Sequence, residues 1–199
     1  MAAIGITGGI STGKTSFVGC LRELMPGARF FDADAAAREW ADSDTEVRGL
    51  IEQEFGAAVY SSTGSLNRAA VRAIVYADAG KKRALEQILH PRIRRQWSLE
   101  AERHRNSTEL FFADIPLLYE TGGETLCDRV VVVACSPRVQ LERLMQRAPL
   151  DEMSARRMID AQMRLTEKIG RADHVVWNNG GRAALKEQAR VLVDFWMTK

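Results

Sequence analysis

The chain has 199 residues, 46% of them hydrophobic, and its 28 basic and 26 acidic residues leave a formal net charge of +2. This length is typical of one compact domain with a real core, and the even mixture of charges argues against a nucleic-acid-binding surface. The three cysteines, Cys20, Cys127 and Cys135, form no CxxC pair, and no apolar run is long enough to span a bilayer or to serve as a signal peptide, so we expect a cytoplasmic protein with no disulfide framework, zinc site or membrane segment.

Short apolar, β-branched or aromatic runs predict five buried strands. These runs lie at residues 2–7, 29–32, 110–114, 129–135 and 174–177. Helical patterns fill the intervals between them. Alternating strands and helices predict an α/β fold with three layers, in which helices cover both faces of a five-stranded parallel sheet.

The spacing of the strands is uneven. Almost eighty residues separate the second strand from the third, and this interval is almost entirely helical in pattern, with a helix break expected where His90 precedes Pro91. We therefore expect a core at 1–32, 108–136 and 171–199, a helical insertion at 33–107, and a mobile cover at 137–170 that is rich in arginine and lysine.

A phosphate-binding loop follows the first strand. Residues 8–15 match the pattern GxxxxGK[ST], with a helix expected from Lys14 onward. Glycines let successive N–H groups converge on phosphate oxygens, and the helix N-terminus adds partial positive charge. We expect Lys14 to reach the β- and γ-phosphates of a nucleoside triphosphate and the Thr15 hydroxyl to bind Mg²⁺.

The sequence favours a kinase over a switch GTPase. The guanine-reading NKxD pattern and the DxxG pattern do not occur in it. A kinase needs an acceptor-binding surface beside the γ-phosphate and a means of excluding water, because an open site would hydrolyse ATP. The helical insertion and the basic interval are candidates for these two parts.

Carboxylates follow the second and third strands, at the edge of a parallel sheet where ligands gather. Asp34, the second acid of Asp32-Ala33-Asp34, is a candidate base for an attacking hydroxyl, and equally a candidate N-cap for a helix at 35–40. Asp114 ends the third strand and is a candidate Mg²⁺ ligand, or else a turn residue before Pro116.

Two arginines, Arg143 and Arg147, lie four residues apart on an expected helix, so both can face one side and bind phosphate oxygens. For an arbitrary pair of arginines, an ordinary solvated basic face is the more frequent explanation. His90 is a candidate for substrate contact or for a structural role, and Arg92 is a candidate for binding a diphosphate or an ordinary surface residue.

Taken in order, these patterns resemble the dephospho-CoA kinase family over nearly the whole chain. The resemblance rests on Gly-Ile-Thr-Gly-Gly-Ile at 5–10, the triplet 32–34 with Arg38, Gly64 to Arg68, Leu85 to Arg94, Asp114 to Glu120, Ser136-Pro137 with Gln140, Arg143 and Arg147, then Gln162, Lys168, Ala172-Asp173 and Asn178-Asn179-Gly180. It implies transfer of the ATP γ-phosphoryl to the ribose 3′-hydroxyl of 3′-dephospho-CoA, in a protein with a P-loop core, a helical CoA-substrate domain at 33–107 and a lid at 137–170.

The resemblance also implies roles for individual residues. Asp34, Lys14 and Arg147 are expected to be catalytic, and Thr15 and Asp114 to hold Mg²⁺. The residues expected to bind ATP are Gly9, Ile10, Ser11, Thr12, Gly13, Lys14, Thr15, Ser16, Arg143, Asn178 and Gly180. Those expected to bind the acceptor are Asp32, Arg38, His90, Arg92 and Leu117.

The sequence departs from the family pattern in three places. Ser11-Thr12 stands where the family loop usually has Gly-Ser, Thr15 replaces a common Ser, and Ala148 stands where an acid often follows the lid arginine. We expect little effect from the first two changes. The competing hypotheses are another P-loop kinase acting on a nucleoside or nucleotide, and a nucleotide-binding regulatory module; we expect a monomer or a weak homo-oligomer.

Overall fold

The computed structural model describes residues 3–105, 109–147 and 149–198, and it divides the chain into two compact units. We call Met1–Phe31 with Ala101–Lys199 the sheet unit, and Asp32–Glu100 the helical unit. Each is described by itself. The roles of 33–107 as a substrate domain and of 137–170 as a lid stay predictions.

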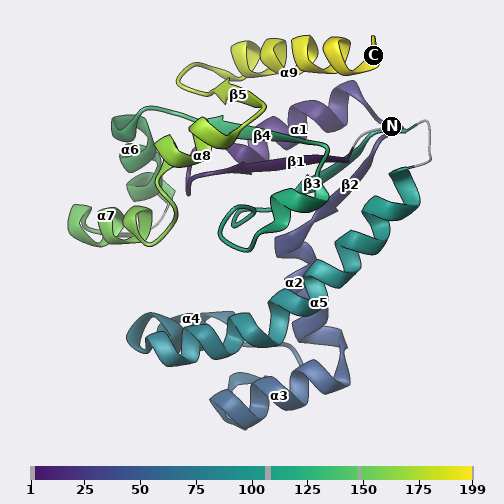
Figure 1. The fold of residues 1–199 in the computed structure, drawn as a ribbon. Helices are drawn as coiled ribbons and strands as arrows, with labels where there is room; N and C mark the ends of the chain where they lie inside the picture. Colours follow the sequence, from purple (N-terminus) through teal and green to yellow (C-terminus); the bar gives the residue numbers. More distant parts are fainter. Residues whose placement is uncertain (1–2, 106–108, 148, 199) are drawn as a thin grey trace. The chain divides into compact units, whose positions relative to one another are not determined.

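The sheet unit contains a five-stranded sheet with the order β2-β3-β1-β4-β5 (Figure 1). Its strands are β1 (Ala3–Gly8), β2 (Arg29–Asp32), β3 (Phe111–Asp114), β4 (Arg129–Ala134) and β5 (His174–Trp177). β1 pairs in parallel with β3 and β4, and β4 pairs in parallel with β5. The predicted α/β fold is confirmed, and each predicted strand lies within one residue of its observed bounds.

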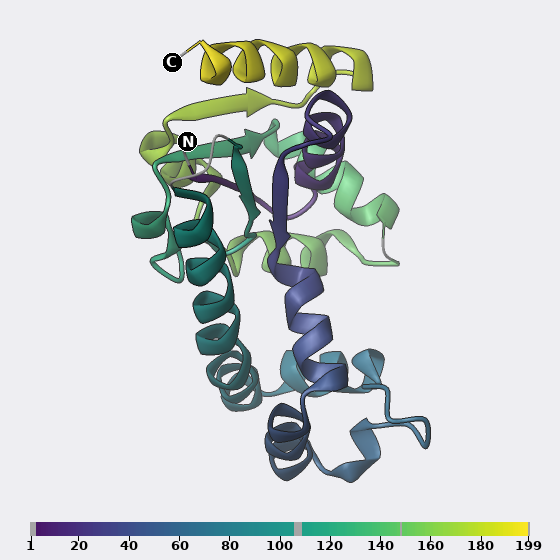
Figure 2. The ribbon, with the colours of Figure 1, turned by 90° about the vertical axis from the view of Figure 1, so that its right-hand side faces the viewer.

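Helices cover the sheet on both faces. Those of the sheet unit are α1 (Lys14–Leu24), η2 (Gly123–Leu126), α6 (Pro137–Arg147), α7 (Glu152–Asp160), α8 (Leu165–Arg171) and α9 (Arg182–Met197). α1 and α9 pack together on one face, where α9 runs beside β5 (Figure 2). The main core lies there, and its fully buried members include Ile4, Ile6, Phe17, Leu21, Phe112 and Val131.

The register of the sheet brings the carboxyl ends of its central strands to one edge. Ile6 of β1 lies opposite Asp114 of β3, and Gly8 of β1 lies opposite Val133 of β4. Ligands of open parallel sheets bind at this edge, because the connecting loops leave a crevice there. The loop that follows β1 therefore starts where Asp114 ends its strand.

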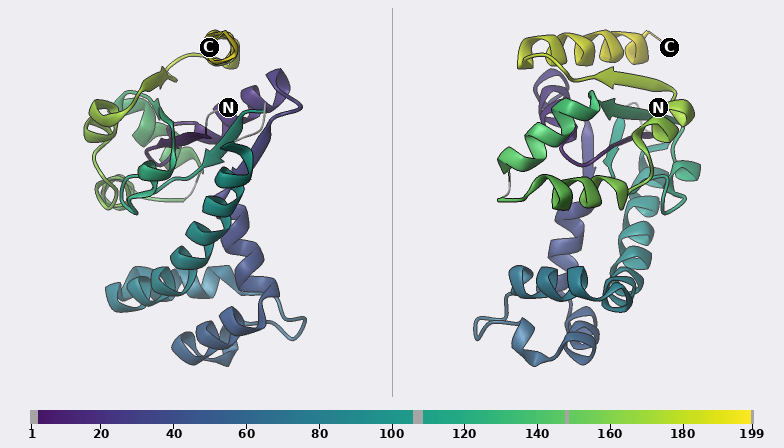
Figure 3. Two further views of the ribbon diagram at one scale, coloured as in Figure 1. Left: turned by 45° about the vertical axis from the view of Figure 1, so that its right-hand side comes forward. Right: turned by 90° about the vertical axis from the view of Figure 1, so that its left-hand side faces the viewer.

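The helical unit has a small core of its own. Its elements are α2 (Ala33–Ser43), α3 (Thr45–Phe55), η1 (Ala57–Val59), α4 (Arg68–Ala77) and the first part of α5 (Ala79–Arg105), seen together in Figure 3. The core consists of Ala41, Val47, Ile51, Val59 and Val71. Local caps start three of these helices, since Asp32, Asp44 and Asn67 each accept a hydrogen bond from the backbone N–H three residues later.

The expected helix break at His90-Pro91 is wrong. α5 is a single helix of 27 residues that contains Pro91 in its interior. A proline removes one backbone donor, here the one for the Gln87 carbonyl four residues earlier. The helix persists because tertiary packing can outweigh one lost hydrogen bond, and Leu85, Ile88 and Leu89 pack against the core of the helical unit. Among the residues that the structure describes, no helix, α5 included, combines the length and the apolar character needed to cross a membrane.

Candidate active site

The glycine-rich loop lies between β1 and α1, as the sequence predicts. Thr12 closes the loop on itself, because its backbone N–H and its hydroxyl both donate to the Gly9 carbonyl, at 3.3 and 2.9 Å. Gly13 has a φ of 93°, an angle that residues other than glycine rarely adopt. A Cβ at this position would overlap the Asn178 amide. Glycine is therefore required at the turn into α1.

Ser11 also has a left-handed backbone, with a φ of 59°. This conformation costs an L-residue about 1–2 kcal/mol, so the serine at this position stores strain that a glycine would not. Its hydroxyl oxygen is buried and makes no hydrogen bond. We expected little effect from the departure at this position, and the backbone angle instead gives it a definite cost.

Lys14 and Asp114 form an ion pair at the strand edge. The Lys14 ammonium donates to Asp114 Oδ1, and the two side chains are only 14% and 10% exposed. Sequence analysis predicted both residues as parts of the site, and the structure brings them together. Asp114 is the last residue of β3 and is buried, and its role as a Mg²⁺ ligand stays a prediction. A cation and a carboxylate thus lie directly below the loop.

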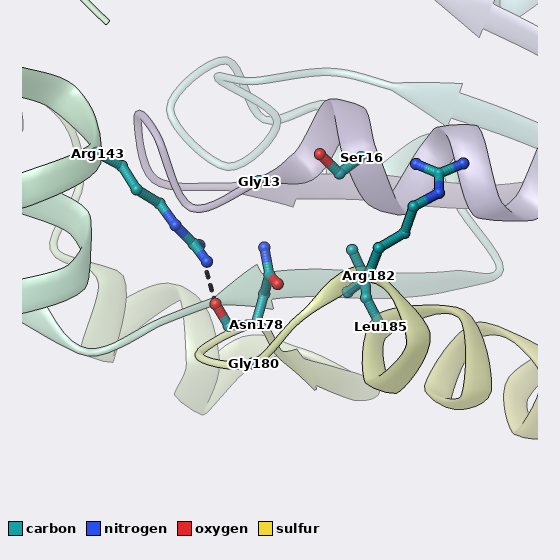
Figure 4. Close-up of a pocket in the computed structure, with 7 residues that line it drawn as sticks. All are labelled: Gly13, Ser16, Arg143, Asn178, Gly180, Arg182 and Leu185. Carbon is teal, nitrogen blue, oxygen red and sulfur yellow. Dashed lines mark hydrogen bonds between the residues drawn. The ribbon is translucent and has the colours of Figure 1, made fainter. Parts of the chain in front are cut away.

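A cavity of about 300 Å³ opens beside the start of α1 (Figure 4). Its lining residues are Gly13, Ser16, Arg143, Asn178, Gly180, Arg182 and Leu185. Figure 4 shows Arg143 reaching toward Asn178, whose carbonyl accepts from the guanidinium at 2.9 Å. The Asn178 amide in turn donates to the Thr12 carbonyl at 2.9 Å. Five of the predicted ATP-binding residues therefore share one pocket.

Sequence analysis missed Arg182 and Leu185, which complete that cavity. No local pattern marks either residue as part of a site. The Arg182 guanidinium donates to Glu23, and Lys186 pairs with the same carboxylate at 2.9 Å. Hydrogen bonds from Lys186 and Arg182 lower the pKa of Glu23. Position at the start of α9, rather than any motif, brings Arg182 to the pocket.

Three residues from α6 to α8 bind the loop itself, although sequence analysis gave them no role. Gln140 Nε2 donates to the Ile10 carbonyl, and the Ile10 N–H donates to Gln162 Oε1, both at 2.9 Å. Lys168 Nζ donates to the Gly8 carbonyl at 3.3 Å. The Ile10 N–H, one of the expected phosphate donors, is therefore already bonded to a side chain.

The helical unit contains Asp34. It is exposed in the first turn of α2, and the alternative that it caps this helix is wrong, because the helix begins two residues earlier than expected. Asp32 is the cap, and its Oδ1 accepts from the Ala35 N–H at 2.9 Å. Arg38 donates to the Asp34 carbonyl at 3.0 Å. The Asp34 carboxylate is thus left for another function, and its role as a base stays a prediction.

The other residues predicted to bind the acceptor have varied surroundings. His90 is half-buried, and burial lowers its pKa against the opposing charge of Glu86. Arg92 forms an ion pair with Glu46 at 2.7 Å in the same unit. Leu117 lies in the sheet unit, where its carbonyl accepts from the Thr121 hydroxyl at 2.8 Å. Their contacts with an acceptor stay predictions.

Arg147 is exposed at the last residue of α6, whereas Arg143 on the same helix reaches the loop. The structure thus separates the two predicted phosphate arginines into a half-buried and an exposed one. Ala148 lies outside the described residues.

The residue types at the loop suit Mg²⁺. This ion prefers oxygen ligands and keeps several waters and substrate phosphates, so it needs only one or two protein groups. Thr15 supplies a hydroxyl and Asp114 a carboxylate. In the described parts of the chain, no three His, Cys, Asp or Glu side chains gather as a self-sufficient metal site. The donor set therefore fits a metal bound mainly through a nucleotide.

Comparison with known proteins assigns the family. The family model described as dephospho-CoA kinase matches residues 2–184. The chain is 44% identical over 196 residues to a dephospho-CoA kinase of Anaeromyxobacter dehalogenans, a match that covers 98% of this chain and 92% of the relative. It is 37% identical to a dephospho-CoA kinase of Bacillus cereus, with 97% and 96% covered.

The chain belongs to the dephospho-CoA kinase family. Its fold also matches a solved dephospho-CoA kinase from Campylobacter jejuni, with a TM-score of 0.75, 24% identity, and 98% and 97% of the two chains covered. Dephospho-CoA kinases are P-loop enzymes that use ATP, and the known function of the family is the last step of coenzyme A synthesis.

Proposed function

We propose that this chain transfers the γ-phosphoryl group of ATP to the 3′-hydroxyl of 3′-dephospho-CoA, giving CoA and ADP. The Lys14–Asp114 pair, where the loop enters α1, carries this proposal, because it places a phosphate-binding cation beside a carboxylate of the type that binds Mg²⁺. The acceptor is inferred from the relatives, which are named dephospho-CoA kinases. The main competing function is phosphorylation of another nucleoside or nucleotide by the same loop.

In the proposed complex, the adenine base fills the cavity beside Gly13 and Asn178. The cavity, about 300 Å³, is at the small end of the range for ligand sites, so it suits a base better than a whole nucleotide. The triphosphate then follows the loop toward Lys14. Here the backbone N–H groups at the end of the loop and the N-terminus of α1 meet its negative charge.

The proposed reaction needs a base, a cation and a site from which water is excluded. Asp34 accepts the proton of the 3′-hydroxyl as that oxygen bonds to the γ-phosphorus, and the bond from that phosphorus to the ADP oxygen breaks. Lys14 and Arg147 stabilise charge that shifts toward ADP. Mg²⁺ held by Thr15 and Asp114 supplies further charge neutralisation when bound. Asp32, Arg38, His90, Arg92 and Leu117 orient the acceptor.

The proposal is tested by measuring ADP release with ATP and a series of acceptors. We expect release to be stimulated strongly by 3′-dephospho-CoA and weakly or not at all by AMP, CMP or pantetheine phosphate. Preference for a nucleoside monophosphate would support the competing kinase. Tight ATP binding with no acceptor-stimulated release would instead indicate a regulatory module.

A cytoplasmic location and a monomeric or weakly self-associating state belong to the same proposal. Neither follows from the geometry of the site. Size-exclusion chromatography with light scattering, run at several protein concentrations, measures the second directly. A stable assembly at nanomolar concentration would contradict it.

A further inference from the structure

Lys168 of α8 is buried completely, which is unusual for a lysine. Its ammonium has three N–H donors, and three acceptors surround it. It bonds to the Gly8 carbonyl at 3.3 Å, the Pro116 carbonyl at 3.0 Å and the Glu120 carboxylate at 2.8 Å. Burial of a charge is costly unless it is paired and hydrogen-bonded, and this one is both.

Two of the three acceptors of Lys168 belong to the chain segments that carry Lys14 and Asp114. Gly8 is the last residue of β1 and starts the phosphate loop, whereas Pro116 follows Asp114 by two residues. The Thr7 hydroxyl also donates to the Pro116 carbonyl, at 2.9 Å. One ammonium thus fixes the start of the loop that bears Lys14 against the strand end that bears Asp114.

The chain leading to Lys168 also reaches the centre of the loop. Glu120 accepts from the Met163 N–H at 3.1 Å, so the same carboxylate anchors Lys168 and the residue next to Gln162. Gln162 in turn accepts from the Ile10 N–H. The loop is therefore held at its start through Lys168 and at its bend through Gln162.

A loop that holds a strained residue needs such support. Ser11, next to Ile10, has a positive φ, and conformations of this kind persist only where the surroundings over-determine them. Donors that stabilise a transferring phosphoryl group are most effective when they are already in place before the substrate arrives. Support from outside the nucleotide pocket therefore bears on binding and rate, as well as on folding.

We infer that Lys168 is a positioning residue for phosphoryl transfer, which holds the phosphate loop and the Asp114 strand end in the geometry that accepts the triphosphate. It acts through the Gly8 and Pro116 carbonyls and touches no substrate. The inference rests on the proposed function and deepens it. A residue with only a stabilising role would affect folding and leave the kinetics of the folded enzyme unchanged.

The test compares Lys168→Met, Glu120→Gln and the double variant with the wild type. Lys168→Met leaves Glu120 without its cation, so we expect a lower Tm and weaker ATP binding. Adding Glu120→Gln removes the uncompensated charge and should restore most of the Tm. The ammonium that links the Gly8 and Pro116 carbonyls is still missing, so kcat/KM for ATP should stay at least 10-fold below wild type. Lys82→Met, at a lysine 52% exposed on α5, serves as the matched control with unchanged kinetics.

Recovery of wild-type kcat/KM together with the Tm in the double variant would overturn the inference. If the Lys168→Met variants do not fold, Glu120→Gln alone decides, because it keeps the shape of the acceptor and weakens its hold on the lysine. We then expect a several-fold loss in kcat/KM for ATP with a small change in Tm, and unchanged kinetics would refute the inference.

ATP affinity, measured directly by calorimetry, separates this inference from the choice of acceptor. A wild type that binds ATP but does not phosphorylate 3′-dephospho-CoA refutes only the proposed function.

Discussion

The phosphate loop of the sheet unit and the helices of the helical unit are held in different ways. Contacts that fix the loop come from far along the chain: Asn178 to Thr12 spans 166 residues, Lys168 to Gly8 spans 160, and Gln162 to Ile10 spans 152. In the helical unit, the caps span three residues, and the Trp40–Gln96 hydrogen bond spans 56.

The two regions therefore depend on different interactions. The loop takes its shape only after β1, β3, β4 and the chain up to Asn178 have assembled, so distant substitutions can alter it. The helical unit depends on a few buried apolar side chains and on local caps. Substitutions in one unit should therefore leave the binding properties of the other largely unchanged.

The largest expected effect comes from Lys14→Met, which removes the cation at the centre of the site. A hydrogen bond to a charged group contributes about 1.5–3 kcal/mol, and loss of one donor that stabilises transition-state charge costs about 10²–10³-fold in rate. We expect kcat/KM for ATP to fall by about 10⁴-fold, with the helical unit still folded by circular dichroism. Lys82→Met is the control; activity within tenfold of wild type would contradict the assigned role.

Asp34→Asn tests the helical unit's part in the chemistry. If Asp34 is the base, kcat should fall by about 10³-fold, within the range for a lost general base, while ATP affinity stays near wild type. Steady-state kinetics and calorimetry measure the two quantities. Asp44→Asn at the N-cap of α3 is the matched control, because it also neutralises a carboxylate at the start of a helix. An unchanged kcat would remove Asp34 from the mechanism.

Ile51→Ala tests whether the two units depend on different interactions. Ile51 is fully buried in the core of the helical unit, and Ile→Ala changes of this kind cost about 2–5 kcal/mol. Denaturant unfolding should show this loss, the KM for the acceptor should rise, and ATP affinity should change by less than about twofold. The exposed Gln53 on the same helix gives the control Gln53→Ala. An equal loss of ATP affinity would show that the units are not independent.

The smallest effect concerns the half-buried thiol of Cys127 in the sheet unit, and it can be seen only at alkaline pH. Burial, and then the charge of Asp128, raise the pKa of Cys127 from 9.0 to about 12. The folded state thus disfavours the thiolate, so this contribution to stability is complete below about pH 9 and is lost as the pH rises toward 12.

Thermal unfolding between pH 7 and 11 measures this contribution. We expect the Tm of Cys127→Ala to fall less steeply above pH 9 than that of the wild type. Burial also raises the pKa of Tyr119 from 10.0 to about 12, so part of the alkaline loss should remain in the variant. Parallel curves for the two proteins would contradict the raised pKa of the thiol.

The five strands, their parallel arrangement and the phosphate loop could be predicted from the sequence alone. Lys14 and Asp114 could also be predicted as residues of the site. Hydrophobic runs and a loop motif are local signals, and a parallel sheet brings the ends of its strands to one edge whatever the intervening sequence. The continuous α5 was not predicted, because the packing of Ile88 and Leu89 against the core of the helical unit is a tertiary contact that outweighs the hydrogen bond lost at Pro91.

The contacts that hold the phosphate loop can be found only in the folded structure. Gln140, Gln162 and Lys168 bind backbone groups of residues 8 and 10, and a backbone acceptor leaves no trace in sequence spacing. The arrival of Arg182 at the cavity depends in the same way on how distant segments pack. The physical reason is that motifs record which atoms can bind phosphate, whereas packing across more than a hundred residues decides which of those atoms are already engaged.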